Sequence, residues 1–128
     1  MKGFVFRTLA VGPHDLSAFL SKRRFEAGMS NMLASFEASC LRRGLSPSSA
    51  RAYLGVIKRF VAWWEGTSGE AFVLQAVTPL DVADYRRYLE TRGFKPATVN
   101  FNLEAIKSFF RWLKEERALP DNPAEGVK

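Results

Sequence analysis

A helix-start phrase that occurs twice limits the fold of this chain more than any other sequence feature. Residues 45–53 place Pro47 ahead of apolar residues at helical spacing, and residues 94–100 do the same with Pro96. Proline fits the first position of a helix, because its missing N–H would have no intrahelical partner there. The apolar residues that follow recur every three or four positions, as on one face of a helix. The phrases therefore predict two amphipathic helices, at 47–65 and 96–117.

Two further main helices are predicted by their end signals. Thr78 is a suitable N-cap for a helix over 79–92, and Asp81 stands three residues later, near the positive end of the helix dipole. An apolar stripe predicts a helix over 31–43, and Gly44 suits the left-handed residue that ends many helices. The four helices together would carry most of the aromatic residues, which supply the core.

A short fifth helix at 13–26 is an open alternative at the front of the chain, with Gly28 as its expected end. The apolar runs at 4–6 and 71–74 allow either strand or loop. The predicted fold class is therefore all-α: a compact bundle of four main helices, with or without one extra N-terminal helix.

Composition narrows the class of protein. The chain has 128 residues, which suits one domain, and a formal net charge of +6, with the basic excess before Gly66. That charge fits a polyanion partner, although an ordinary basic protein remains the alternative. Cys40 is the single cysteine, so an intramolecular disulfide and a cysteine-rich zinc site are excluded. No apolar run is long enough for a membrane span, and no signal peptide is visible. We expect a cytoplasmic protein without a metal or other cofactor.

The order of motifs resembles the N-terminal core-binding domain of the tyrosine recombinases, the phage-integrase type of site-specific recombinase. The resemblance covers residues 31–123. It is carried by these residues in chain order: Phe36 and Leu41-Arg42-Arg43-Gly44-Leu45; Ser49-x-x-x-Tyr53 with Ile57 and Phe60; Leu80-x-x-Val-x-x-Tyr85; Thr98-Val99-Asn100 with Leu103, Ile106-Lys107-Ser108-Phe109-Phe110 and Trp112-Leu113; and Asn122-Pro123.

The resemblance implies a SAM-like helical domain that forms half of a C-shaped clamp around duplex DNA. Its second and fourth helices would address the major groove at a recombination half-site. The catalytic half of such an enzyme carries a His-x-x-Arg pair and a nucleophilic tyrosine. Here the single histidine, His14, is followed by Asp15-Leu16-Ser17, so that pair is absent. We therefore expect a DNA-binding domain and not an enzyme, with 1–30 as a variable extension, 31–120 as the core-binding domain and 121–128 as the start of a linker to an absent catalytic domain.

Basic, hydroxyl and amide side chains on the predicted helices are the candidate DNA contacts. Basic groups bind phosphates, hydroxyls near helix starts donate to phosphates, and asparagine amides read adenine edges. The expected DNA-binding residues are Arg42, Arg43, Ser48, Ser49, Arg51, Lys58, Arg59, Lys95, Thr98, Asn100, Asn102, Lys107 and Arg111.

Each group also has an interpretation without DNA. Arg42 and Arg43 complement a helix dipole at its negative end. The hydroxyls can be caps alone, the asparagines simple polar surface, and Glu104 an i,i+3 partner for Lys107. The three tyrosines within predicted helices are expected in the core and not as nucleophiles: Tyr53 and Tyr85, which lie on apolar faces, and Tyr88. Trp63 and Trp64 are expected in the core, with stacking on bases as the alternative, and Cys40 is expected to be a buried, inert thiol.

Two functions from different classes stay open. The resemblance favours a partner of double-stranded DNA, with other recombinase subunits joining in a full-length protein and the isolated domain monomeric. The alternative is a helical protein-interaction module that mediates recombinase subunit contacts through residues 1–30 or the last helix, with incidental basic charge. A salt-dependent interaction with DNA separates the two.

Overall fold

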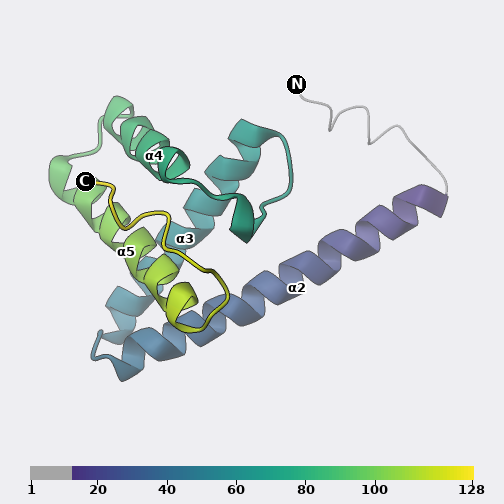
Figure 1. The fold of residues 1–128 in the computed structure, drawn as a ribbon, viewed down its shortest axis with the longest axis horizontal. Helices are drawn as coiled ribbons and strands as arrows, with labels where there is room; N and C mark the ends of the chain where they lie inside the picture. The colour runs from purple at the N-terminus through teal and green to yellow at the C-terminus, as the bar shows by residue number, and fades with distance from the viewer. Residues whose placement is uncertain (1–12) are drawn as a thin grey trace. The chain divides into compact units, whose positions relative to one another are not determined.

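The computed structural model describes the backbone from residue 13 to residue 128 and side chains from residue 27 onward. All regular structure in this part of the chain is helical, which confirms the all-α class (Figure 1). The elements are α2 (Pro13–Arg42), α3 (Pro47–Ser68), the 3-10 helix η1 (Leu74–Ala76), α4 (Pro79–Thr91) and α5 (Pro96–Glu115). The chain divides into two compact units, Met1–Gly44 and Leu45–Lys128, and each is described separately.

Helix α2 is one unbroken helix of 30 residues, whereas the sequence predicted two helices with an end at Gly28. That prediction is wrong because glycine inside a helix costs only about 1 kcal/mol relative to alanine. No proline accompanies Gly28, and Ser30 and Asn31, which could cap a new helix, lie within the continuous helix. The expected end at Gly44 is confirmed: this residue has a φ of 100°. The apolar run at 4–6 lies outside the described residues.

Prolines begin each of the three helices of the second unit, as the sequence predicted. Ser46 caps α3, and its hydroxyl accepts a hydrogen bond from the Ser49 N–H at 3.1 Å. The helix extends beyond its expected end at residue 65 to Ser68, and Gly69, with a φ of 77°, is its C-cap. The sequence thus located the starts of the helices more accurately than their ends.

Asp81 joins the start of α4 to the end of α3. Its Oδ2 accepts hydrogen bonds from the Thr78 N–H at 3.0 Å and from the Trp64 indole N–H at 3.1 Å. The Asp81 N–H binds the Thr78 hydroxyl in return, which completes a capping box. The segment before it is not a strand, because the Phe72 N–H binds the Glu65 carboxylate at 2.8 Å and no ladder forms there.

The core of the second unit is built around Phe60 on α3. Its ring lies edge-on to Phe72, Tyr85 and Phe110, with centroids 6.4, 5.2 and 6.4 Å away. These rings come from the segment before α4, from α4 and from α5, so the Phe60 side chain contacts all three. The three helices pack as an aromatic-centred unit, with the polar side of α3 left exposed.

The C-terminal segment runs back along α5 towards the start of that helix (Figure 1). Leu119, Ala124 and Val127 are buried, and the Asn122 side chain donates to the Lys107 carbonyl at 3.4 Å. Residues expected to begin a linker therefore form part of the folded unit. Among the described helices, none has a stretch long and apolar enough to span a bilayer.

Candidate nucleic-acid interface

The exposed side of α3 carries three cations, Arg51, Lys58 and Arg59. Their spacing of seven and eight residues places them along one side of the helix. Gly55 lies between them, and a Cβ atom at this position would stand 3.2 Å from Nη1 of Arg59. The Arg59 side chain therefore lies back over Gly55, towards Arg51. The absence of a side chain at Gly55 leaves room for this arrangement of positive charge.

These three cations lack a carboxylate partner in the part of the chain that the structure describes. The ion pairs found there both lie on α4: Arg86 with Glu90 at 3.3 Å and Arg87 with Asp84 at 2.6 Å. The single acidic residue of α3, Glu65, is bound to a backbone N–H. The charge on α3 is thus available to a ligand, whereas the charge on Arg86 and Arg87 is compensated within α4.

Serine hydroxyls surround the start of α3. The Ser46 hydroxyl donates to that of Ser49 at 3.0 Å and lies 3.3 Å from that of Ser48. Capping is therefore carried out by Ser46, while Ser48 is exposed and Ser49 half-buried. Ser49 accepts from Ser46 through its oxygen, so its own hydroxyl proton can be directed to a phosphate. Ser48 and Ser49 thus lie beside the first turn of the helix that carries Arg51.

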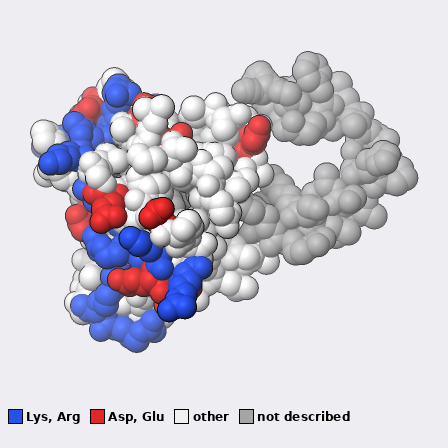
Figure 2. All heavy atoms as spheres, viewed as in Figure 1, with Lys and Arg blue, Asp and Glu red and all other residues white. Residues whose placement is uncertain are grey.

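The basic residues of α5 have a different environment. Lys107 is half-buried, and with Arg111 and Lys114 it lines an open pocket that also contains Asn122 and Glu125 of the C-terminal segment. Figure 2 shows lysines and arginines interleaved with acidic side chains on this face. No ion pair joins Lys107 or Arg111 to Glu125 among the described residues, but this carboxylate makes their surroundings less positive than those of the α3 cations. Lys107 and Arg111 are therefore weaker candidates for phosphate contact than the α3 cations.

The remaining candidates at the start of α5 differ in their exposure to solvent. Lys95 occupies the N-cap position without a side-chain cap, and Thr98 is exposed. Asn102 does not lie on this surface: it is buried, and its amide donates to the Thr98 carbonyl at 2.8 Å. An adenine edge cannot reach it there. Asn102 is buried because it lies on the core side of α5, one residue before the buried Leu103.

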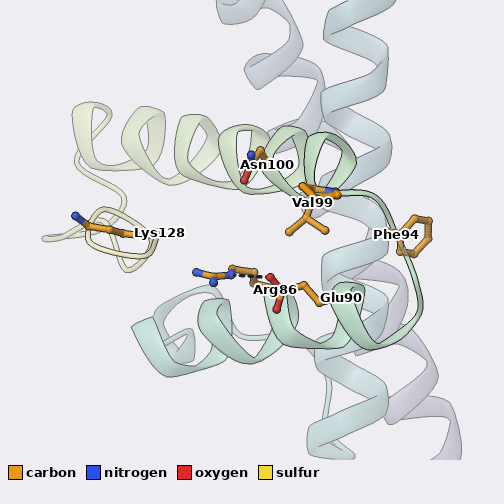
Figure 3. A pocket seen from close by; sticks show the side chains of 7 residues that line it. Arg86, Glu90, Phe94, Val99, Asn100 and Lys128 are labelled. Atoms are coloured by element: carbon orange, nitrogen blue, oxygen red, sulfur yellow. Dashed lines mark hydrogen bonds and ion pairs between the residues drawn. The ribbon is translucent and has the colours of Figure 1, made fainter.

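Asn100 is exposed but lines a pocket between α4 and α5 (Figure 3). The Arg86–Glu90 ion pair lies in the same pocket, together with Lys128. A carboxylate beside the amide makes this a mixed environment and not a uniformly positive one. Asn100 is therefore placed apart from the cations of α3.

Arg42 and Arg43 belong to the first unit, where both are exposed at the end of α2. Arg43 Nε donates to the Ser39 carbonyl at 3.4 Å, and Nη2 lies 4.0 Å from the Cys40 sulfur. The helix-end role that the sequence offered as an alternative is thus realised for Arg43. No group of three or more His, Cys, Asp or Glu residues gathers as a metal site within the described residues.

Sequence reasoning missed an aromatic cluster between α3 and α4. Trp63, Tyr85 and Tyr88 lie ring to ring, and the guanidinium carbon of Arg92 stands 5.5 Å from the Tyr88 centroid. Tyr85 is buried as expected, but Tyr88 is 36% exposed and Trp63 is half-buried. Burial raises the pKa of Tyr85, and the nearby charge of Arg59 opposes that rise. In the sequence, the i,i+4 spacing of Tyr88 and Arg92 could have indicated the contact between this ring and the guanidinium.

The family of the chain follows from its match to a family model. Residues 32–118, well over half of the chain, match the phage integrase, N-terminal SAM-like domain. The chain belongs to this family. The family expected from the sequence is thereby confirmed, and α3 to α5 lie within the matched SAM-like region.

A curated relative supports the same assignment. The chain is 28% identical over 87 residues to a tyrosine recombinase XerD of Chlorobaculum tepidum. The aligned part is 68% of this chain and 28% of that protein, so the chain spans little more than a quarter of the relative. The comparison with solved structures gave no significant match.

Proposed function

We propose that this SAM-like domain binds duplex DNA for a site-specific tyrosine recombinase or integrase, and that α3 grips the phosphate backbone at a recombination half-site. The observation that carries the proposal is the row formed by Arg51, Lys58 and Arg59, which is exposed and lacks carboxylate partners among the described residues. Family membership makes DNA the polyanion of choice. The proposal assigns DNA binding, and no chemical step, to this chain.

The physical basis is the release of counterions from DNA. Each phosphate neutralised by lysine or arginine contributes about −0.9 to the slope of log affinity against log salt. About four contacts would give a slope near −3.6. Three come from α3, and Lys107 or Arg111 is the candidate for the fourth, although Glu125 lies in the pocket that they line. Ser48 and Ser49 would add hydroxyl donors at the start of α3.

Fluorescence anisotropy with a labelled random duplex across a salt series tests the proposal. The Arg51→Gln/Lys58→Gln variant removes two cations from α3. The matched control, Arg86→Gln/Arg87→Gln, removes two cations that are already paired on α4. We expect the α3 variant to lose close to two units of slope and at least tenfold in affinity at low salt, whereas the control keeps nearly all of both.

The opposite ranking would place the DNA on α4 and overturn the assignment to α3. Equal losses in both variants would show that net charge, and not a defined surface, drives binding. Circular dichroism must show that both variants are folded, and these exposed substitutions are expected to leave the core intact. Salt-insensitive binding by the unaltered domain would contradict the whole proposal.

Contacts between recombinase subunits are a second candidate function, and exposed apolar side chains favour it. Leu80 and Phe94, at the two ends of α4, are 65% and 47% exposed. Surface of this kind is typical of interaction sites when it is contiguous. We expect the isolated domain to be monomeric and to associate only in longer recombinase chains. Sedimentation that shows association of this chain without DNA binding would favour the interaction module over the DNA-binding domain.

A further inference from the structure

The cluster between α3 and α4 has an inner ring and two outer rings. Tyr85 is buried, whereas Trp63 is half-buried and Tyr88 is 36% exposed. The centroid distances are 5.1 Å for Trp63 to Tyr85, 6.1 Å for Trp63 to Tyr88 and 5.9 Å for Tyr85 to Tyr88. Two aromatic groups with polar ends, an indole N–H and a phenol, are thus held at the surface by a buried third ring.

Two arginines flank these rings. Arg92 lies over Tyr88, with its guanidinium carbon 5.5 Å from the centroid. Arg59 precedes Trp63 by one helical turn on α3; its guanidinium lies back over Gly55, and its charge acts on the buried Tyr85. The cluster therefore connects the cation row of α3 to the end of α4. We call Arg59, Trp63, Tyr88 and Arg92 the bridging surface.

The carboxylates of α4 are committed elsewhere. Asp81 binds Trp64 and Thr78, while Asp84 and Glu90 form the ion pairs with Arg87 and Arg86. Within the described residues, neither Arg59 nor Arg92 forms an ion pair with them. The bridging surface consequently carries two uncompensated positive charges. The cation–π contact with Tyr88 holds the Arg92 side chain in place without neutralising its charge.

We propose that the DNA-binding surface continues from α3 across the bridging surface, so that Arg92 holds a backbone phosphate of duplex DNA. The inference rests on the function proposed above and extends it to the end of α4, a helix that carries none of the DNA contacts expected from the sequence. The Tyr88 ring orients the guanidinium before binding, so Arg92 loses less side-chain freedom when a phosphate arrives. The Tyr88 hydroxyl belongs to the ring that supports Arg92 and is a second candidate donor to the same phosphate.

Stacking of single-stranded bases is disfavoured by the same geometry. Base stacking needs an open aromatic face. The Tyr88 ring is stacked on Tyr85 with an angle of 21° between planes, and Arg92 also lies over it. Trp63 is stacked on Phe60 at 27° and tilted against both tyrosines. The rings are therefore engaged with each other, and the exposed chemistry is cationic.

The test compares two arginines of the same helix. Arg92→Gln removes the proposed phosphate contact, and Arg87→Gln removes an equal charge that is paired with Asp84. Anisotropy with duplex DNA across a salt series is expected to show a slope smaller by about 0.9 for Arg92→Gln, with a several-fold loss of affinity. The Arg87→Gln control should match the unaltered chain in both quantities.

The role of the ring is tested by a double-mutant cycle. Tyr88→Leu removes the support for Arg92, and Tyr88→Phe keeps the ring while deleting the hydroxyl. We expect Tyr88→Leu and Arg92→Gln to be non-additive, because each removes the same phosphate contact. Additive losses would overturn the orienting role of Tyr88. Thermal melts must first show that Tyr88→Leu is folded. Tyr88→Phe, which keeps the ring, is the control and should bind nearly like the unaltered chain, and the Arg92→Gln comparison tests the phosphate contact without either variant.

The outcomes separate this inference from the proposed function. If Arg92→Gln behaves like Arg87→Gln while Arg51→Gln/Lys58→Gln still weakens binding, the extension to α4 is overturned and the α3 interface stands. If Tyr88→Leu weakens binding to a single strand more than to a duplex, base stacking is the better description and the phosphate contact is rejected. If the unaltered chain does not bind duplex DNA, both proposals fail together.

Discussion

At the scale of single residues, Asp81 joins two helices through one side chain. One carboxylate oxygen receives both the N-terminal N–H of α4 and the indole N–H of Trp64, a side chain that is 8% exposed. Losing the carboxylate would remove a capping box and leave a largely buried donor without a partner. A helix cap is worth about 1 kcal/mol, and an unsatisfied buried donor costs about 1–3 kcal/mol.

We therefore expect Asp81→Ala to lower the free energy of unfolding by about 2–4 kcal/mol, measured by urea denaturation. Asp84→Ala is the matched control, because it removes a carboxylate from an exposed ion pair on the same helix. Such pairs contribute about 0–1 kcal/mol. Similar losses in the two variants would show that the bond to Trp64 has little energetic weight.

At the scale of elements, the C-terminal segment completes the unit built by α3, α4 and α5. Ala124 is fully buried and Val127 is 8% exposed, although both follow the last helix. Asn122 fixes the turn by donating to the Lys107 carbonyl and accepting from the Ala124 N–H at 2.9 Å. The segment is thus held by apolar burial and by hydrogen bonds to its own turn and to α5.

Deletion of residues 124–128 should lower the free energy of unfolding by about 2 kcal/mol, because burial of a valine side chain alone contributes about 1.5–3 kcal/mol. Deletion of Lys128 alone, an exposed residue, is the control and should leave the midpoint of urea unfolding nearly unchanged. A five-residue deletion that is as stable as the control would mean that the segment packs without stabilising the unit.

The sequence predicted the starts of elements well because proline and capping residues act locally. Pro47, Pro79 and Pro96 each begin a helix, and Thr78 forms the expected capping box. It predicted poorly where the local signal is weak or where the outcome depends on distant contacts. Gly28 lies within a helix because a small local cost does not stop α2.

The same distinction applies to the candidate interface. The cations of α3 could be identified from helical spacing, because their exposure follows from one helix alone. Asn102 is buried although it lies one helical turn from Thr98, and the proximity of Trp63 to Tyr88 requires α3 and α4 to be side by side. Sequence periodicity does not contain that pairing of helices. The bridging surface therefore became visible only in three dimensions.

At the scale of the whole molecule, the single thiol lies in one unit and the proposed DNA contacts of α3 and α4 lie in the other. Cys40 is fully buried, and burial raises the pKa of its thiol above the ordinary value of 9.0, with Arg43 opposing the rise. Near neutral pH the folded state holds this thiol protonated and covered. An alkylating or disulfide reagent can therefore modify it only after a local or global opening.

The rate at which a reagent modifies Cys40 therefore reports how often the structure around this residue opens. We expect Cys40 to react at least a hundredfold more slowly than a free thiol in the same buffer, with a rate set by the opening equilibrium. The rate of Cys40 modification gives a free energy of opening, and urea unfolding followed by tryptophan fluorescence gives a free energy of unfolding for the second unit. If the two free energies are equal, the two units unfold cooperatively. A smaller value from the thiol would mean that α2 opens around Cys40 independently of the second unit, so that the proposed DNA contacts of α3 and α4 could stay folded while the thiol is exposed.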